Sequence, residues 1–460
     1  MGEKREWLEE LKRELPEGRL LTSREDRVAY SYDATWEEGW PDAVVLAHAT
    51  EDVVATLRVA QKYRVPVVPR GAASGLSGGS VPEHGGISLS LAPMRRIIEI
   101  SPEDLVAVVQ PGVINLDLQK ALEPHGLFYP PDPASYDMST IGGNIAENAG
   151  GPRCLKYGVT TDYVMGLEVV IPGGEVLRLG GRSIKNVTGY DLVRLFVGSE
   201  GTLGVVTEAT LKLLPKPPAT ATVSAFFDNL NVAAETVVAV LTSGILPLTT
   251  ELLDGVSIRV VEDFLHLGLP AGAEAMLLIA VEGETGCVKE EIARVEGICR
   301  THGASTVETA ATPEEESRLW RARRSVAAAL GRLRPHTLGE DIAVPRSRIP
   351  EMVRTIQEIG ERWGVTIAVY GHIGDGNLHP TIACDRNDPD EMDRVSKAAE
   401  EIFAAAVRMG GTLSGEHGIG TVKRAFLPSA LPNNVLDMMK AVKQIFDPQG
   451  IMNPGKVFPD

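Results

Sequence analysis

Short apolar runs alternate with amphipathic segments through residues 42–215. Residues 43–47 form an apolar run, residues 51–63 show helical periodicity after Thr50 as the helix cap, and residues 65–68 are apolar again. This order predicts a β-α-β unit near the start of the chain. Apolar runs bounded by glycine and proline predict further strands around residues 86–91, 105–109, 164–171 and 204–214.

A second α/β pattern follows residues 214–218, a proline-rich segment that is stiff, poor in hydrogen-bond donors and therefore typical of a domain boundary. Beyond it, Thr312, Pro313 and Glu315 indicate the start of a long helix, with a capping box and a proline at the first helical position. Between these points the pattern predicts strands near 222–227 and 275–281 and helices around 232–242 and 288–302.

The length and charge of the chain narrow the classes of function. At 460 residues it can form two or three domains, and a formal net charge of −17 without a basic patch argues against nucleic acid and anionic membranes as partners. The start of the chain resembles a charged amphipathic helix rather than a signal peptide, and no apolar run could span a bilayer. We therefore expect a soluble, cytoplasmic protein without a transmembrane segment.

The four cysteines are widely scattered and form no Cys-x-x-Cys pair from which a zinc knuckle or an iron–sulfur cluster could be built. Any electron transfer in this chain would therefore need an organic cofactor.

Three glycine-rich stretches, residues 68–80, 140–151 and 197–206, are candidates for binding such a cofactor. The first places four glycines, three serines and Arg70 after a predicted strand, where backbone N–H groups and polar side chains can approach an anion. It matches neither the dinucleotide fingerprint nor the P-loop, and by itself it could equally be a structural turn. Three such loops in one domain suit an extended ligand better than a single phosphate.

A histidine-containing hairpin is predicted after the β-rich run 365–370. If Asp375 and Gly376 form its two-residue loop, His372 lies directly opposite His379, with their Cβ atoms about 4.5–5.5 Å apart. Two imidazoles at that separation can bind one metal ion, although two histidines on a solvent face would fit the same spacing. Residues 414–420 add a carboxylate and an imidazole among glycines, a composition that rarely serves packing, and so favour the metal site.

Arg323 falls within the apolar face of the helix predicted after Thr312. Leu319, Arg323, Val326 and Leu330 follow helical spacing, so the guanidinium is expected to be buried. A buried arginine needs an anionic partner, which could be a bound substrate carboxylate or an internal core carboxylate.

Four segments together resemble one known family: PRGAASGLSGG, YPPDPAS, TIGGNIAENAGGPRCLKYG and GSEGTLGVVTE. They are similar to the FAD-binding domain of the vanillyl-alcohol oxidase and p-cresol methylhydroxylase superfamily, in the branch of the glycolate oxidase flavin subunit and the D-lactate and D-2-hydroxyglutarate dehydrogenases. The resemblance implies an α+β fold, with a two-subdomain FAD-binding domain of the p-cresol methylhydroxylase type in residues 1–217. It also implies an α/β cap domain with an antiparallel sheet in residues 218–410 and a C-terminal segment, 411–460, that returns to the FAD domain.

In that family the first loop wraps the FAD pyrophosphate and the other two cover the flavin and adenine portions. Because the first loop contains neither His nor Cys, and Cys154 does not match a known attachment position, FAD is expected to bind noncovalently. The resemblance implies these cofactor-binding residues: Pro69, Arg70, Gly71, Ala72, Ala73, Ser74, Gly75, Leu76, Ser77, Pro131, Asp132, Ser135, Thr140, Gly142, Gly143, Asn144, Ala146, Glu147, Asn148, Gly151, Tyr157, Gly158, Glu200, Gly204, Val205, Val206 and Asn453.

The resemblance also implies a catalytic centre. His372, His379 and Glu416 would hold a divalent metal, Zn, Fe or Mn, and His417 would be the catalytic base, with Arg323 and Asn377 as substrate contacts. A 2-hydroxy acid bound to the metal would lose its hydroxyl proton to the base and a hydride to flavin N5, which leaves a keto acid.

Departures from the family pattern narrow the class of substrate, and the lack of a cluster motif implies an external electron acceptor. Ala327 and approximately Gly339 replace a Thr and a Lys of the D-2-hydroxyglutarate branch, which favours a small monocarboxylate such as D-lactate or glycolate. Electrons would pass to an electron-transfer flavoprotein, an iron–sulfur subunit, a quinone or a cytochrome, with oxygen less favoured and a homodimer as an option. The alternatives are a D-2-hydroxyglutarate-type dehydrogenase, a flavin subunit inactive by itself, and a metal-dependent hydrolase whose glycine loops are plain turns.

Overall fold

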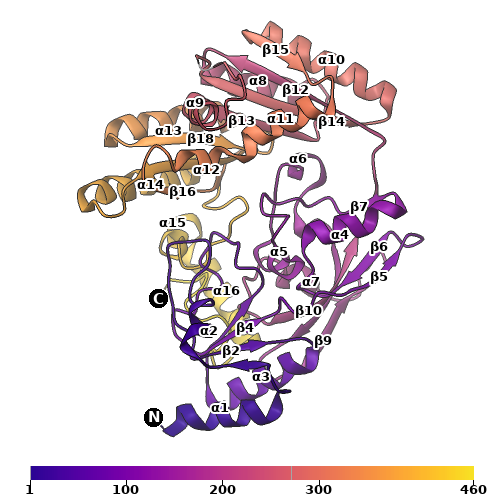
Figure 1. Ribbon diagram of the computed structural model, residues 1–460, viewed down its shortest axis with the longest axis vertical. Coiled ribbons are helices and arrows are strands. Elements are labelled where there is room, and N and C mark those ends of the chain that lie inside the picture. The colour runs from indigo at the N-terminus through magenta and orange to yellow at the C-terminus, as the bar shows by residue number, and fades with distance from the viewer. Residues whose placement is uncertain (1, 271, 460) are drawn as a thin grey trace. The chain divides into compact units, whose positions relative to one another are not determined.

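A computed structural model describes residues 2–270 and 272–459, which fall into two compact units (Figure 1). Unit 1 comprises Met1–Gly150, Gly158–Lys216 and Glu416–Asp460, and unit 2 comprises Gly151–Tyr157 and Pro217–Gly415. This grouping differs from the sequence-based division in three places, because residues 151–157, Pro217 and residues 411–415 belong to unit 2.

The first sheet of unit 1 contains the expected β-α-β unit, in which α3 (Thr50–Tyr63) connects two strands that are both parallel to a third. The helix begins one residue earlier than expected. Its N-cap is Ala49, and Thr50 is already helical; Asp52 of the first turn instead accepts a hydrogen bond from the His48 backbone N–H. The strand order is β1 (Leu20–Leu21), β2 (Ala43–Leu46), β4 (Ile87–Ser90), β3 (Val67–Arg70).

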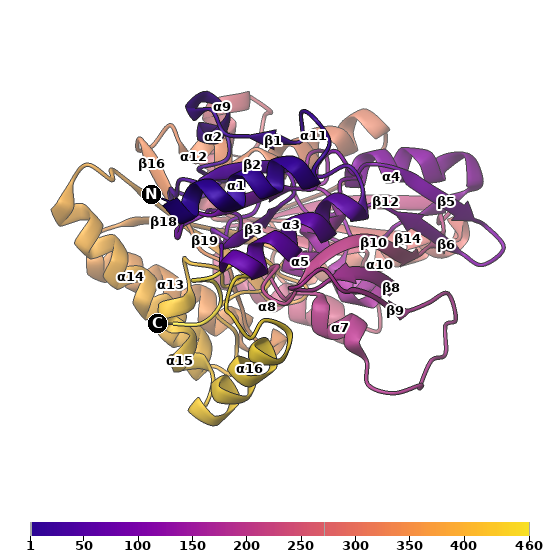
Figure 2. The same cartoon turned by 90° about the horizontal axis from the view of Figure 1, so that it is seen from below.

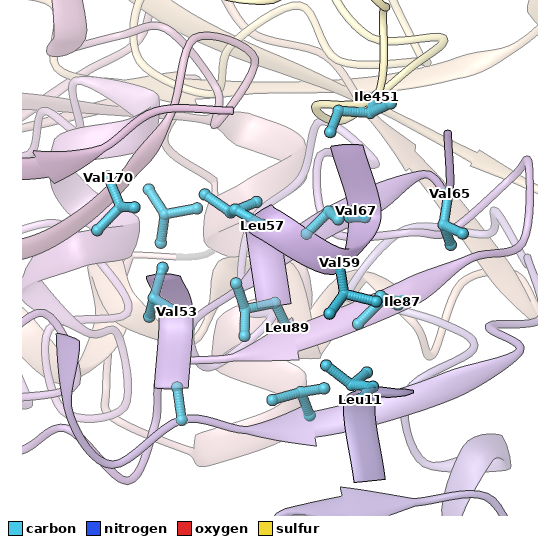
Figure 3. Close-up of a cluster of buried hydrophobic side chains, with 14 of the residues drawn as sticks. Leu11, Val53, Leu57, Val59, Val65, Val67, Ile87, Leu89, Val170 and Ile451 are labelled. Carbon is cyan, nitrogen blue, oxygen red and sulfur yellow. The ribbon is translucent and has the colours of Figure 1, made fainter. Parts of the chain in front are cut away.

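The core of unit 1 lies against this sheet (Figure 3). Its centre is formed by fully buried side chains of α3, β3 and β4: Leu57, Val67, Ile87 and Leu89. Ile451, near the end of the chain, packs into the same cluster, and its carbonyl oxygen accepts a hydrogen bond from the Val67 N–H. The Asn453 N–H donates in turn to the Val67 carbonyl, so the C-terminal segment is built into unit 1 beside β3.

The second sheet of unit 1 is antiparallel throughout, with its longest strand, β10, at the centre. Buried and partly buried residues alternate along β10, as expected for a strand with one face on a core. In Figure 2 the long connection between β9 and α7 extends away from the neighbouring strands, and its residues 181–191 are exposed. The order is β5 (Ile97–Ser101), β6 (Val106–Val109), β10 (Val205–Lys212), β8 (Val164–Val170), β9 (Val176–Gly180).

Unit 2 is built on one antiparallel sheet, with short β17 (Ile342–Ala343) paired to β19 at its edge. Helices α8 (Leu230–Thr242), α10 (Thr285–Thr301), α13 (Ile349–Trp363) and α14 (Pro389–Arg408) pack in one group, and α9 (Gly255–Leu265), α11 (Pro313–Arg324) and α12 (Val326–Leu330) in another. The order is β15 (Thr306–Thr309), β12 (Ala219–Phe227), β14 (Ala275–Gly283), β13 (Thr249–Asp254), β18 (Thr366–Gly371), β19 (Asn377–Cys384), β16 (His336–Gly339).

The helix predicted after Thr312 is divided in two. Thr312 caps α11 by accepting from the Glu315 N–H at 3.2 Å, while the Glu315 carboxylate reaches back to the Ala311 N–H rather than to the cap residue. Ser325 ends α11 and precedes α12, so the apolar stripe continues across a break in the helix.

The remaining elements are short or lie near the chain ends. None of the helices in residues 2–270 and 272–459 is both long and apolar enough to cross a bilayer. These elements are α1 (Gly2–Glu14), α2 (Arg24–Val28), α4 (Asn115–Leu122), β7 (Leu127–Phe128), α5 (Ile141–Glu147), α6 (Cys154–Tyr157), α7 (Leu192–Phe196), β11 (Leu214–Pro215), α15 (Leu427–Ala430) and α16 (Asn433–Phe446), with 3-10 turns at Glu123–His125, Thr160–Asp162, Arg346–Arg348 and Arg424–Phe426.

Candidate functional site

A cavity in unit 1 lies between the first two glycine-rich stretches. Thr140 caps α5 by accepting from the Gly143 N–H at 3.2 Å, which turns the second stretch into the start of a helix. A Cβ at Gly71 would collide with the Thr140 hydroxyl, so glycine allows this approach of the two loops, and a Cβ at Gly142 would collide with Pro111. The predicted cofactor residues that line the cavity are Pro69, Arg70, Gly71, Ala72, Ala73, Ser74, Gly75, Leu76, Ser135, Thr140, Gly142, Gly143, Asn144, Ala146, Glu147 and Glu200.

Other predicted cofactor residues lie outside this lining. Asn148 is the left-handed C-cap of α5 and accepts from the Thr161 N–H, and Asn453 donates to the carbonyl oxygens of Gly79 and Glu200. Tyr157 belongs to unit 2, where its hydroxyl donates to Glu282. Their contact with a cofactor stays a prediction, as it does for Ser77, Pro131, Asp132, Gly151, Gly158, Gly204, Val205 and Val206.

Two buried carboxylates stand in or beside this cavity. Glu147 Oε1 accepts from the Ser77 hydroxyl at 2.9 Å, while Glu147 Oε2 is buried without a hydrogen-bond partner among the described residues. Burial, followed by the charge of Glu200, holds the pKa of Glu147 well above its usual range. Burial also raises the pKa of Glu200, although the Ile419 and Gly420 N–H groups donate to it at 2.8 and 2.7 Å.

The C-terminal glycine cluster brings two of the predicted site residues to the same cavity. Glu416 and His417 both line it, and both belong to unit 1. Gly418 and Gly420 have positive φ angles, and a Cβ at either position would collide, with Glu147 or with the Ser77 carbonyl respectively. The glycines are therefore required for this segment to pack against the first loop.

The histidine hairpin of unit 2 has a different register from the one predicted. Tyr370, not His372, lies opposite His379, because β18 ends at Gly371 and the chain makes a longer turn before Asn377. Within that turn the His372 carbonyl accepts from the N–H groups of Asp375 and Asn377. The predicted two-residue loop is therefore wrong.

The two imidazoles nevertheless meet. Their ring centroids are 5.2 Å apart and nearly perpendicular, and His372 and His379 are only 4% and 6% exposed. The alternative of two histidines on a solvent face is thus excluded. His372 Nδ1 lies 2.7 Å from Glu251 Oε1, whereas His379 Nδ1 lies 3.6 Å from Asp341 Oδ1.

Glu251 is a buried carboxylate that the sequence analysis did not identify. It lies in β13, has no exposed surface, and accepts a hydrogen bond at 2.5 Å from Arg323 Nε through Oε2. The internal carboxylate weighed as an alternative partner for Arg323 is therefore present, and the guanidinium also stacks 5.1 Å from the centre of the Tyr370 ring. Burial alone would raise the pKa of Glu251, but the charges of His372 and Arg323 outweigh it and lower the pKa to about 2.

Asp341 is a second missed carboxylate, and it organises the segment that precedes Glu416. Its Oδ2 accepts from the Ser414 hydroxyl at 2.6 Å and from the Gly415 N–H at 2.8 Å. Asn377 uses its side-chain N–H groups to donate to Asp341 Oδ1 and to the Ile342 carbonyl. The chain then passes from unit 2 to unit 1 between Gly415 and Glu416.

Two family models match the chain. The model of the C-terminal domain of FAD linked oxidases matches residues 216–457, and an FAD binding domain model matches residues 41–180.

Curated relatives cover nearly the whole chain. The glycolate oxidase subunit GlcD of Bacillus subtilis (strain 168) is 49% identical, over 95% of this chain and 93% of its own length. The glycolate oxidase subunit GlcD of Escherichia coli (strain K12) is 40% identical, over 98% of this chain and 90% of its own, and the D-lactate dehydrogenase of Anaerostipes hadrus is 34% identical, over 98% and 97%.

Solved structures show the fold. A p-cresol methylhydroxylase with substrate bound aligns over 100% of this chain and 98% of its own, with a TM-score of 0.82 and 18% identity. An alkyldihydroxyacetonephosphate synthase aligns over 98% and 85%, with a TM-score of 0.77 and 21% identity. The predicted fold class, an FAD-binding domain of this type followed by a cap domain with an antiparallel sheet, is confirmed.

Proposed function

The chain belongs to the FAD-linked oxidases, and from this premise we propose that it oxidises a small D-2-hydroxy acid, D-lactate or glycolate, to the 2-keto acid. It is an FAD-dependent oxidoreductase of the hydroxy-acid class, which sets aside the hydrolase alternative. One arrangement of side chains carries the finer proposal. Glu251 contacts both Arg323 and His372, and the ring of His372 meets that of His379. A guanidinium suited to a substrate carboxylate therefore lies in the same cluster as two imidazoles suited to a metal ion.

The cavity of unit 1 has the features that a bound FAD needs. Glycines line it where side chains would collide, and the buried Glu147 Oε2 has no protein partner among the described residues. We assign the first loop and the start of α5 to holding the cofactor, noncovalently, since the loop contains neither His nor Cys. FAD bound there would supply the hydride acceptor.

The donor set of unit 2 fits a divalent metal. Glu251 and Asp341 face the Nδ1 atoms of His372 and His379, so each Nε2 is the nitrogen proposed to bind Zn, Fe or Mn. The family resemblance implies Glu416, a residue of unit 1, as the third ligand. The metal would lower the pKa of the substrate hydroxyl. His417 would accept the hydroxyl proton as the general base.

Arg323 is proposed to bind the substrate carboxylate. Its Nε is committed to Glu251, and its terminal nitrogens make no hydrogen bond within the described residues, so they are the donors proposed to meet the substrate. Asn377 has committed its N–H groups to Asp341 and Ile342, which leaves its amide oxygen for the proposed substrate contact.

We propose a short substrate because two positions lack a side chain that could bind a second carboxylate. Ala327 and Gly339 offer no cation for a second carboxylate, which disfavours the D-2-hydroxyglutarate alternative. Two of the relatives are named as subunits, which supports passage of electrons to a partner, either an electron-transfer flavoprotein or an iron–sulfur subunit. A chain with no activity by itself remains the second candidate on the same ground.

Anaerobic titration of the purified yellow protein tests the proposal. D-lactate and glycolate are expected to bleach the flavin absorbance, L-lactate to be far weaker, and D-2-hydroxyglutarate to have little effect. Removing metal with a chelator should abolish bleaching while FAD stays bound, and readdition should restore it. No bleaching by any hydroxy acid in the metal-loaded protein would contradict the proposal and favour the inactive-subunit candidate.

A further inference from the structure

Glu251 divides its two oxygens between two different partners. Oε1 is 2.7 Å from His372 Nδ1, and Oε2 accepts from Arg323 Nε at 2.5 Å. The residue lies in the middle of β13, a strand paired to β14 and β18, and all six residues of β13 are buried. Thr249, on the same face two residues earlier, donates its hydroxyl to Oε1 at 3.0 Å.

This geometry determines which atoms of the two partners are not engaged by Glu251. A histidine that donates its Nδ1 proton to a carboxylate presents Nε2 as a metal-binding lone pair. An arginine held through Nε presents its two terminal nitrogens, the pair that matches a carboxylate. The Tyr370 ring lies against the guanidinium, with its centre 5.1 Å from Arg323 Cζ.

We propose that Glu251 is a positioning residue that couples metal binding to substrate-carboxylate binding, by holding His372 and Arg323 through one buried carboxylate. This inference rests on the proposed function of the two residues. Asp341 is not equivalent, because it lies 3.6 Å from His379 Nδ1 and is already engaged with Asn377, Ser414 and Gly415. Loss of Glu251 should therefore weaken both kinds of binding, although Glu251 touches neither ligand.

The first test measures binding of Co²⁺ to the metal-stripped full chain, by its visible absorption, and of D-lactate to the Co²⁺-loaded chain. Glu251→Gln keeps the size of the side chain but not its charge, and is expected to lower Co²⁺ affinity by about 10–100-fold, with a changed absorption band and weaker D-lactate binding. Unchanged Co²⁺ affinity and spectrum would overturn the proposal.

Asp254→Asn is the matched control. Asp254 is a buried carboxylate three residues further along β13, where it caps α9 through Ser257 and accepts from the Val369 N–H. Its carboxylate bonds to Ser257 and Val369 rather than to His372 or Arg323, so this variant should lose stability but keep Co²⁺ affinity. An equal loss of Co²⁺ affinity in both variants would show that general destabilisation is the cause, and would also overturn the proposal.

A measurement on the unaltered chain avoids any folding defect. In ¹⁵N-histidine NMR spectra of the metal-free protein at alkaline pH, assigned with a His372→Gln variant, the His372 signal should show a proton on Nδ1. A His372 with Nδ1 unprotonated would contradict the inference. Neither test uses FAD reduction, so a failed flavin titration and a failed role for Glu251 are distinguishable.

Discussion

Each unit holds a glutamate with a buried carboxyl oxygen, yet the two carboxyl groups behave in opposite ways. Glu251 in unit 2 lies between an arginine and a histidine, and its pKa falls to about 2. Glu147 in unit 1 has a serine hydroxyl and a second carboxyl group, Glu200, as neighbours, and its pKa lies well above the usual value. Burial is shared, so the neighbours decide the charge.

The difference matches what each region is proposed to bind. The raised pKa of Glu147 disfavours a negative charge in a cavity that would hold the phosphates of FAD, whereas the lowered pKa of Glu251 favours an anion beside Arg323.

The largest expected effect separates the roles of the two regions in the reaction. His417→Ala, in the cavity of unit 1, should slow flavin reduction by D-lactate about 10²–10⁴-fold in stopped-flow measurements while FAD content and D-lactate binding persist. Arg323→Ala, in unit 2, should mainly weaken D-lactate binding. His125→Ala, at an exposed position of unit 1, is the control and should change neither. A near-normal rate in His417→Ala would remove this residue from the proposed base role.

Glu251→Leu tests how strongly unit 2 depends on its anion. Arg323 and His372 would be left without their buried partner, so the free energy of unfolding should fall by about 3–5 kcal/mol in urea denaturation. Arg259→Ala, which breaks the exposed pair with Glu274, should cost under about 1 kcal/mol. Equal losses in the two variants would mean that the buried triad stabilises no more than a surface pair.

Glu147→Gln should stabilise the chain, whereas Glu251→Leu should destabilise it. A raised folded-state pKa means that the contribution of Glu147 to stability is complete below its ordinary pKa of 4.5 and is lost as pH rises through the folded-state value. At pH 8 the unaltered chain has lost this contribution, which amounts to about 1.4 kcal/mol for each unit of pKa shift. The Glu147→Gln variant, measured without FAD, should therefore unfold at a higher temperature than the unaltered chain at pH 8. The gain should disappear at pH 4; a loss at pH 8 would show that Glu147 is ionised there.

The smallest expected effect is a change in stability at acidic pH. Because its folded-state pKa is depressed, Glu251 contributes stability that is complete above pH 4.5 and lost as pH falls toward about 2. The stability advantage of the unaltered chain over Glu251→Gln should therefore shrink between these values in thermal unfolding scans. An advantage independent of pH across this window would mean that packing, rather than charge, separates the two proteins.

Local sequence was sufficient for the features that depend on neighbouring residues. The glycine-rich stretches predicted a cavity for an extended ligand because chain contacts that exclude a Cβ require glycine, as at Gly71 and Gly142. Thr312 predicted a helix start because its hydroxyl needs only the Glu315 N–H. Motif combination also identified the family and its fold.

The register of the histidine hairpin is a feature that local sequence rules predicted wrongly. Asp375-Gly376 suggested a two-residue loop, but Gly371 adopts a φ of 151° and the chain takes a longer turn, which moves His372 out of register. The imidazoles still meet, because Glu251 holds the ring of His372 from a strand that lies more than a hundred residues earlier in the chain. No spacing within the hairpin contains that information.

By itself, therefore, the sequence determined the family and the fold class, and it named the candidate cofactor loops and candidate site residues, since these depend on residue type and short spacing. The tertiary structure alone decided that Glu251 stands behind both His372 and Arg323, and that Glu147 stands beside Glu200. The physical reason is that the charge of a buried group depends on neighbours brought together by folding, whatever their separation along the chain.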